Sequence, residues 1–118
     1  MAKAAIMILA DGESHESEGR VVNGLMVARE LQDAGDDVTV LFDGAGTQAA
    51  ATFGRPEHEH HDLVDGVRDS IAGACKYCAG AFGATEGVEA AEIELLDEYK
   101  GHPSIKKLID AGYEIVSF

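Results

Sequence analysis

The 118-residue chain carries 22 acidic against 9 basic side chains, for a formal net charge of -13. This charge disfavours binding to nucleic acid phosphates and to anionic membranes. No apolar run approaches the roughly 18 to 20 residues of a membrane span, and the start of the chain lacks an export signal, so a cytoplasmic location is expected. With 46% hydrophobic residues, residues 1–118 are predicted to form a single globular domain.

The acidic residues are spread along the whole chain and do not form a tail. They indicate a solvated surface, and in this number they also favour a protein from a salt-loaded cytoplasm. We therefore expect a halophilic source.

The first half of the chain predicts a strand, a helix and a second strand. Residues 3–10 are almost continuously apolar, which is typical of a parallel strand covered on both faces. Residues 11–19 are expected to form a loop, and a helix from Val21 should end at residues 34–35. Residues 37–43 predict the second strand, residues 44–47 a turn and residues 48–53 a short helix. Val22 and Met26 lie off the helix's apolar stripe and could contact a partner subunit.

The second half continues the alternation. A helix is expected where Leu63, Val64, Val67 and Ile71 recur at helical spacing. Residues 70–83 could continue this helix or form a short strand and a new helix, and Gly73 with the shift in pattern favours a strand, then a turn, then a helix. A weak strand is expected at residues 93–96. A last helix should begin at residues 102–104 and turn Ile105, Leu108 and Ile109 inward, and a final strand should span residues 113–118. The pattern predicts an α/β fold with three layers, an open and mostly parallel sheet of about five strands between helices.

Cys75 and Cys78 form the most specific chemical signal in the chain. Two cysteines at this spacing indicate redox, metal or nucleophile chemistry in a reducing compartment. If Cys75 opens a helix beside Lys76, its thiol pKa should be lowered and Cys75 should react before Cys78. Cys78 would lie on the same helix face, as a resolving thiol or as a packed side chain.

Other candidate sites are weaker. A structural zinc site needs four ligands, and no second cysteine pair is present. The segment with His58, His60 and His61 is interpreted as a polar loop, because nothing in the sequence fixes a metal geometry there. The polar residues 11–17 are likewise interpreted as loop structure. Neither a dinucleotide fingerprint nor a P-loop occurs, so no cofactor and no metal are predicted.

The run of residues 74–83, ACKYCAGAFG, resembles the DsrE/DsrF family, in which a cysteine opens a small-residue helix that ends at glycine. Residues 31–44 are similar to the family's helix, glycine, strand and Asp-Gly turn, and residues 108–118 match its final helix and strand. The resemblance implies a flavodoxin-like fold without flavin, assembly as a trimer or hexamer, and a persulfide carried on Cys75. Together with the acidic composition it suggests a halophilic archaeal member. Cys78 departs from the pattern, since relay proteins usually have a small apolar residue there.

The leading hypothesis is therefore an intracellular sulfur carrier or sulfurtransferase. Cys75 would accept sulfane sulfur and pass it to a thiol partner, a protein or a small thiol, with Cys78 assisting release. The alternatives are an oligomeric binding module with inert cysteines and a protein that cycles a Cys75 to Cys78 disulfide.

Overall fold

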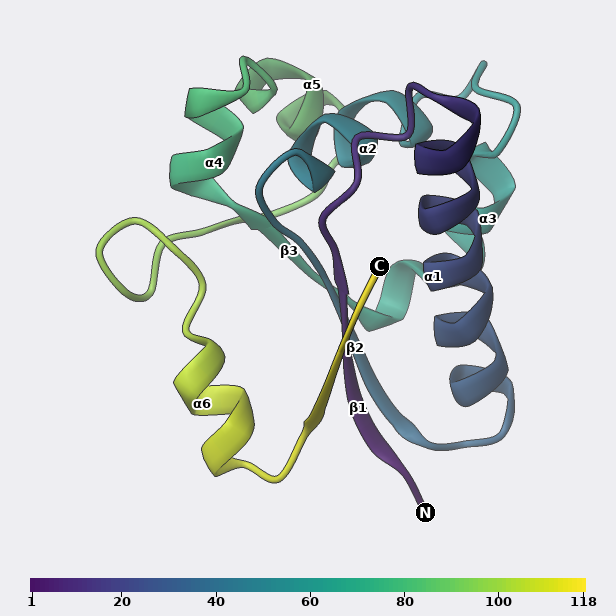
Figure 1. Ribbon diagram of the computed structural model, residues 1–118, viewed down its shortest axis with the longest axis vertical. Helices are drawn as coiled ribbons and strands as arrows, with labels where there is room; N and C mark the ends of the chain where they lie inside the picture. The colour runs from purple at the N-terminus through teal and green to yellow at the C-terminus, as the bar shows by residue number, and fades with distance from the viewer.

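A five-stranded sheet, parallel at every strand pair, forms the centre of the computed structural model, which describes residues 1–118 (Figure 1). Its strands follow the spatial order β4-β3-β2-β1-β5. They are β1 (Lys3–Ile8), β2 (Asp37–Phe42), β3 (Ile71–Cys75), β4 (Leu95–Leu96) and β5 (Glu114–Ser117). The predicted α/β fold is confirmed, and the sheet is wholly parallel.

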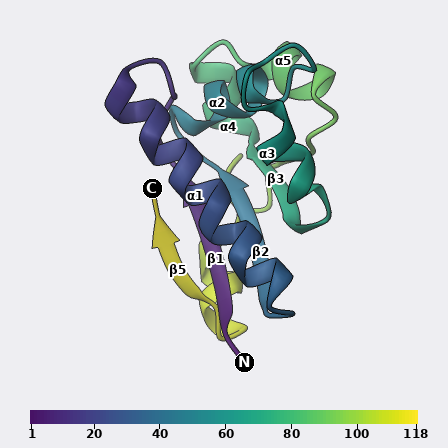
Figure 2. The ribbon, with the colours of Figure 1, turned by 90° about the vertical axis from the view of Figure 1, so that its right-hand side faces the viewer.

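Helices lie on both faces of this sheet and beyond the carboxyl ends of its strands. The six helices are α1 (His15–Asp33), α2 (Gly46–Phe53), α3 (His61–Gly66), α4 (Lys76–Ala81), α5 (Thr85–Ala90) and α6 (Ile105–Asp110), with a 3₁₀ turn at Arg68–Ser70. Helix α1 lies along one face and α6 along the other, while α2, α4 and α5 gather beyond the carboxyl ends of the strands (Figures 1 and 2). None of these helices combines the length and the apolar character needed to cross a bilayer.

The core explains why the strand predictions succeed. Ala5, Ile6 and Ile8 in β1 have no exposed surface, as expected for a central strand that carries helices on both sides. The largest buried side chains are Phe42 at the end of β2 and Phe53 at the end of α2. Burial of these rings joins α2 to the sheet just beside the carboxyl ends of β2 and β3.

Several element boundaries differ from the sequence prediction. Helix α1 starts six residues before Val21, because the Ser14 side chain caps it by accepting the backbone N–H of Ser17. Helix α2 starts at Gly46, within the expected turn. Helix α4 follows β3 directly, without the expected turn between them, and Gly73 lies inside β3, where a Cβ would come within 2.5 Å of the carbonyl oxygen of Glu94.

Two helices of the second half also differ from expectation. Helix α5 was not predicted; it packs on α2 so closely that a Cβ at Gly87 would lie 2.6 Å from the Cβ of Ala51. In α6, Ile109 is 58% exposed and does not face the core. Ile105 and Leu108 are only half-buried, so none of the three apolar residues expected to face inward is part of the core.

Candidate functional site

Cys75 lies where the sequence places it, at the junction between β3 and α4. It is the last residue of β3 and the N-cap of α4, and its Sγ accepts the backbone N–H of Cys78 at 3.4 Å. The side chain has no exposed surface, whereas Cys78 is partly exposed. Both thiols are free.

Asp43 brings a carboxylate to this pair from the neighbouring strand. It directly follows β2, and its Oδ1 accepts the backbone N–H of Gly44 at 2.8 Å and the Cys78 thiol at 3.4 Å. Since β2 and β3 are parallel neighbours, their carboxyl ends meet at one edge of the sheet. The signal was present in the sequence, because an acidic residue after one buried strand and a cysteine after the next should lie close together.

His102 completes the cluster from the loop after β4. Its Nδ1 lies 3.2 Å from the Sγ of Cys75. Tyr99 and His102 exchange two backbone hydrogen bonds of 2.8 Å, and the intervening Lys100 and Gly101 both have positive φ, 49° and 88°. This tight turn, of the kind that glycine favours, points the imidazole back at Cys75. From the sequence, residue 102 was predicted only as part of a helix opening, so His102 was missed as a site residue.

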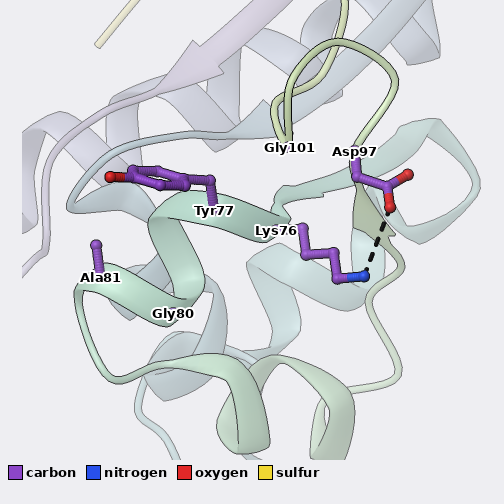
Figure 3. Close-up of a pocket in the computed structure, with 6 residues that line it drawn as sticks. All are labelled: Lys76, Tyr77, Gly80, Ala81, Asp97 and Gly101. Atoms are coloured by element: carbon purple, nitrogen blue, oxygen red, sulfur yellow. Dashed lines mark ion pairs between the residues drawn. The ribbon is translucent and has the colours of Figure 1, made fainter.

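The aromatic ring of Tyr77 covers the imidazole of His102. The ring centroids are 4.9 Å apart, and the Tyr77 backbone N–H donates to the Gly101 carbonyl at 2.9 Å. Beside them lies a surface pocket of about 570 Å³, lined by Lys76, Tyr77, Gly80, Ala81, Asp97 and Gly101 (Figure 3). The pocket opens next to the loop that holds His102, because Gly101 forms part of its wall.

The expected lowering of the Cys75 pKa is wrong. Burial raises the pKa of the Cys75 thiol to about 12, and the negative charge of Asp43 adds to the shift, while the backbone N–H of Cys78 opposes it only in part. Lys76 gives no help, because its Nζ lies 3.5 Å from Asp97 Oδ2 and both side chains are largely in solvent (Figure 3). In the resting protein Cys75 is therefore a neutral thiol beside an imidazole.

Four side chains with potential metal-ligand atoms meet at this cluster, which the sequence did not predict. One ligand atom from each of Asp43, Cys75, Cys78 and His102 lies within 4.8 Å of every other. The second cysteine pair that the sequence lacks is replaced by a carboxylate and an imidazole from other segments. This set of donors can hold a metal ion as well as support thiol chemistry.

The histidine-rich segment does not join this cluster. His58 and His60 stack on Phe53 at centroid distances of 4.3 and 5.7 Å, and His60 also faces Glu18 at 3.7 Å. His61 Nε2 lies 3.1 Å from Asp65. These contacts attach the segment to α2 and α1.

Comparisons with known proteins support the fold and leave the activity open. No family model matches the chain. The chain is 28% identical over 96 residues to the uncharacterized protein MJ0733 of Methanocaldococcus jannaschii. These aligned residues cover 81% of this chain and 78% of that protein. Among solved structures it is similar to the conserved protein of unknown function BT1422 from Bacteroides thetaiotaomicron, with a TM-score of 0.67 and 20% identity over 97% of this chain and 94% of that one. This likeness shows the α/β fold.

Proposed function

We propose that the protein is a cytoplasmic sulfur carrier of DsrE/DsrF type that holds sulfane sulfur as a persulfide on Cys75. The observation that carries the proposal is the 3.2 Å approach of His102 Nδ1 to Cys75 Sγ. A neutral thiol becomes a nucleophile when a neighbouring base takes its proton during attack, and an imidazole at hydrogen-bond distance is such a base.

The transfer balances without an oxidant. Cys75 attacks the outer sulfur of a donor persulfide R–S–SH, the donor's S–S bond breaks, and a new S–S bond forms at Cys75. His102 takes the Cys75 proton and returns it to the leaving thiolate, which departs as R–SH. Discharge to an acceptor thiol is the same step in reverse. The resemblance of residues 74–83 to the DsrE/DsrF family supports this assignment.

Cys78 supports release of the sulfur. The Cys78 thiol donates to Asp43 Oδ1, and Cys78 lies in the first turn of α4, three residues after Cys75. Attack of Cys78 on the Cys75 persulfide would form a Cys75 to Cys78 disulfide and expel hydrogen sulfide, so the pair can discharge when no acceptor is present. The alternative of a purely dithiol redox protein rests on the same proximity and would give the disulfide without a stable persulfide.

Intact-mass measurement after exposure to glutathione persulfide tests the proposal. The wild-type chain should gain one sulfur atom. Cys75→Ser should gain none in the same time, although Cys78 is the more exposed thiol, because the His102 imidazole lies at hydrogen-bond distance from Cys75. Cys78→Ser should keep its load longer. His102→Gln should load more slowly by roughly a hundredfold, the scale of general base catalysis. Gain of sulfur by Cys75→Ser at the wild-type rate would show that Cys75 is not the carrier. A circular dichroism spectrum of each variant checks that the fold is kept.

A further inference from the structure

We propose that Asp43, Cys75, Cys78 and His102 form a tetrahedral binding site for a zinc ion. The proposal goes beyond sulfur transfer and does not depend on it. Its basis is the convergence of four metal-ligating atoms, each within 4.8 Å of the other three, from three separate segments of the chain.

The distances fit a tetrahedral ion. Bonds of about 2.3 Å to sulfur and about 2.0 Å to nitrogen or oxygen place neighbouring ligand atoms roughly 3.3 to 3.8 Å apart. Cys75 Sγ lies 3.2 Å from His102 Nδ1, and Cys78 Sγ lies 3.4 Å from Asp43 Oδ1. Two edges of the tetrahedron are thus within a few tenths of an ångström of the required length before any ion binds, and the remaining edges, each no longer than 4.8 Å, need to shorten by up to about 1.5 Å.

The chemistry of the donors selects zinc over the common hard cations. Two thiol sulfurs and an imidazole suit a borderline-soft ion, whereas magnesium and calcium prefer six or more oxygen ligands. Binding releases the two thiol protons to solvent. The charge of the zinc ion then neutralises two of the three negative charges on the two thiolates and the carboxylate. No oxidation or reduction takes place.

The surroundings hold these ligands in orientation. The backbone N–H of Gly44 fixes Asp43 Oδ1 at 2.8 Å, and the Tyr77 ring lies over the imidazole of His102. Cys75 is fully buried, and all four ligand positions come from the protein. The site is therefore of the closed, four-ligand type in which zinc is held tightly and no coordination position is left for a substrate.

Occupation by zinc has a direct consequence for the thiols. Both sulfurs would be engaged by the ion, so the zinc-loaded chain would not accept sulfur until the ion is removed. Zinc and sulfane sulfur would then compete for one site.

Titration of the reduced, metal-free protein with cobalt(II) tests the proposal, because cobalt(II) reports tetrahedral thiolate ligation by its visible and near-ultraviolet absorption. We expect one cobalt per chain with strong visible bands and thiolate charge transfer, and displacement by one equivalent of zinc. Cys78→Ser should remove about half of the charge-transfer intensity. Asp43→Asn and His102→Ala should each lower the zinc affinity by roughly tenfold to a hundredfold.

A matched control is available in the second cluster of the chain. Glu18, Glu59 and His60 also bring three ligand atoms together, so His60→Ala should leave the cobalt spectrum and the zinc affinity unchanged. Weak octahedral bands without thiolate charge transfer would overturn the proposal, as would equal zinc affinity in the wild type, Asp43→Asn and His102→Ala. Because the titration uses no sulfur donor, its result is independent of whether Cys75 carries a persulfide.

Discussion

Replacing Gly46 with alanine should strongly destabilise the protein, because the first residue of α2 lies directly against the backbone of β1. A Cβ at this position would lie 1.8 Å from the carbonyl oxygen of Ile8 and 2.6 Å from its carbonyl carbon. Real Cβ contacts essentially never fall below 3.0 Å, so α2 and β1 would have to separate by more than 1 Å. The Ile8 oxygen also accepts the backbone N–H of Asp43 at 2.9 Å, so the same contact helps to position the cluster of Asp43, Cys75, Cys78 and His102.

The expected cost follows from overpacking against backbone. Such changes cost typically 1 to 3 kcal/mol and sometimes more, and a backbone clash that no rotamer relieves belongs at the upper end, at about 3 kcal/mol or above. For a domain of this size roughly 4 °C of melting temperature is lost per kcal/mol, so Gly46→Ala should melt about 10 °C or more below the wild type.

Gly19→Ala is the matched control. Gly19 lies inside α1, and nothing is within 4 Å of the position its Cβ would take. Alanine should therefore stabilise the helix by about 0.5 to 1 kcal/mol and raise the melting temperature by roughly 2 to 4 °C. Thermal unfolding followed by circular dichroism in one buffer measures both. A Gly46→Ala protein that melts within 2 °C of the wild type, on the scale of about 0.5 kcal/mol, would refute the close approach of α2 to β1.

Four further outcomes are expected. Cys78 should be alkylated before Cys75 in the native protein, because Cys75 is fully buried and its pKa is raised to about 12; peptide mapping that finds Cys75 labelled first would contradict this. The melting temperature should rise steeply from low to molar potassium chloride, because salt screens the repulsion among acidic side chains that give the chain a net charge of -13. A melting temperature that does not change with salt would contradict the expectation of a halophilic source. The Tyr113 hydroxyl donates to Asp37 at 2.8 Å, and this bond raises the pKa of Tyr113. The bond therefore stabilises the fold below about pH 10, and its contribution is lost as the pH rises through the pKa of Tyr113 in the folded protein. The difference in melting temperature between the wild type and Tyr113→Phe should shrink in strong base. A trimer or hexamer is expected from the resemblance to the DsrE/DsrF family, with the half-exposed Met26 in reach of a partner subunit, and light scattering that finds a 12.4 kDa monomer at micromolar concentration would contradict this.

The parts of the fold that follow from local pattern were predictable. The apolar runs of β1 and β2 are buried on both faces, so composition alone marks them as strands of a parallel sheet. Helix α5 was missed because its one buried side chain, Val88, leaves no apolar stripe to detect. Its place depends on the close contact of Gly87 with Ala51, which only the packing of α5 on α2 reveals.

The site shows the same division between local and distant information. The position of Cys75 at the start of α4 was correct, because it depends on residues adjacent in the chain. Its pKa was not, since the burial that raises it comes from packing of other segments. His102 was missed because a turn with two positive φ values, 27 residues further along the chain, directs it to Cys75.

The short strand β4 leaves the cover over Cys75 weakly attached to the sheet. This strand pairs with β3 through only two residues, and beyond it the loop that carries His102 has one backbone hydrogen bond to α4, from Tyr77 to Gly101, with the ion pair of Lys76 and Asp97 largely in solvent. Segments with so few contacts open by local unfolding at a fraction of the free energy needed to unfold the whole chain. Amide hydrogens of residues 97–102 should therefore exchange faster than those of β1 and β2. The population of this open form, rather than global stability, would then set how often Cys75 is exposed to solvent.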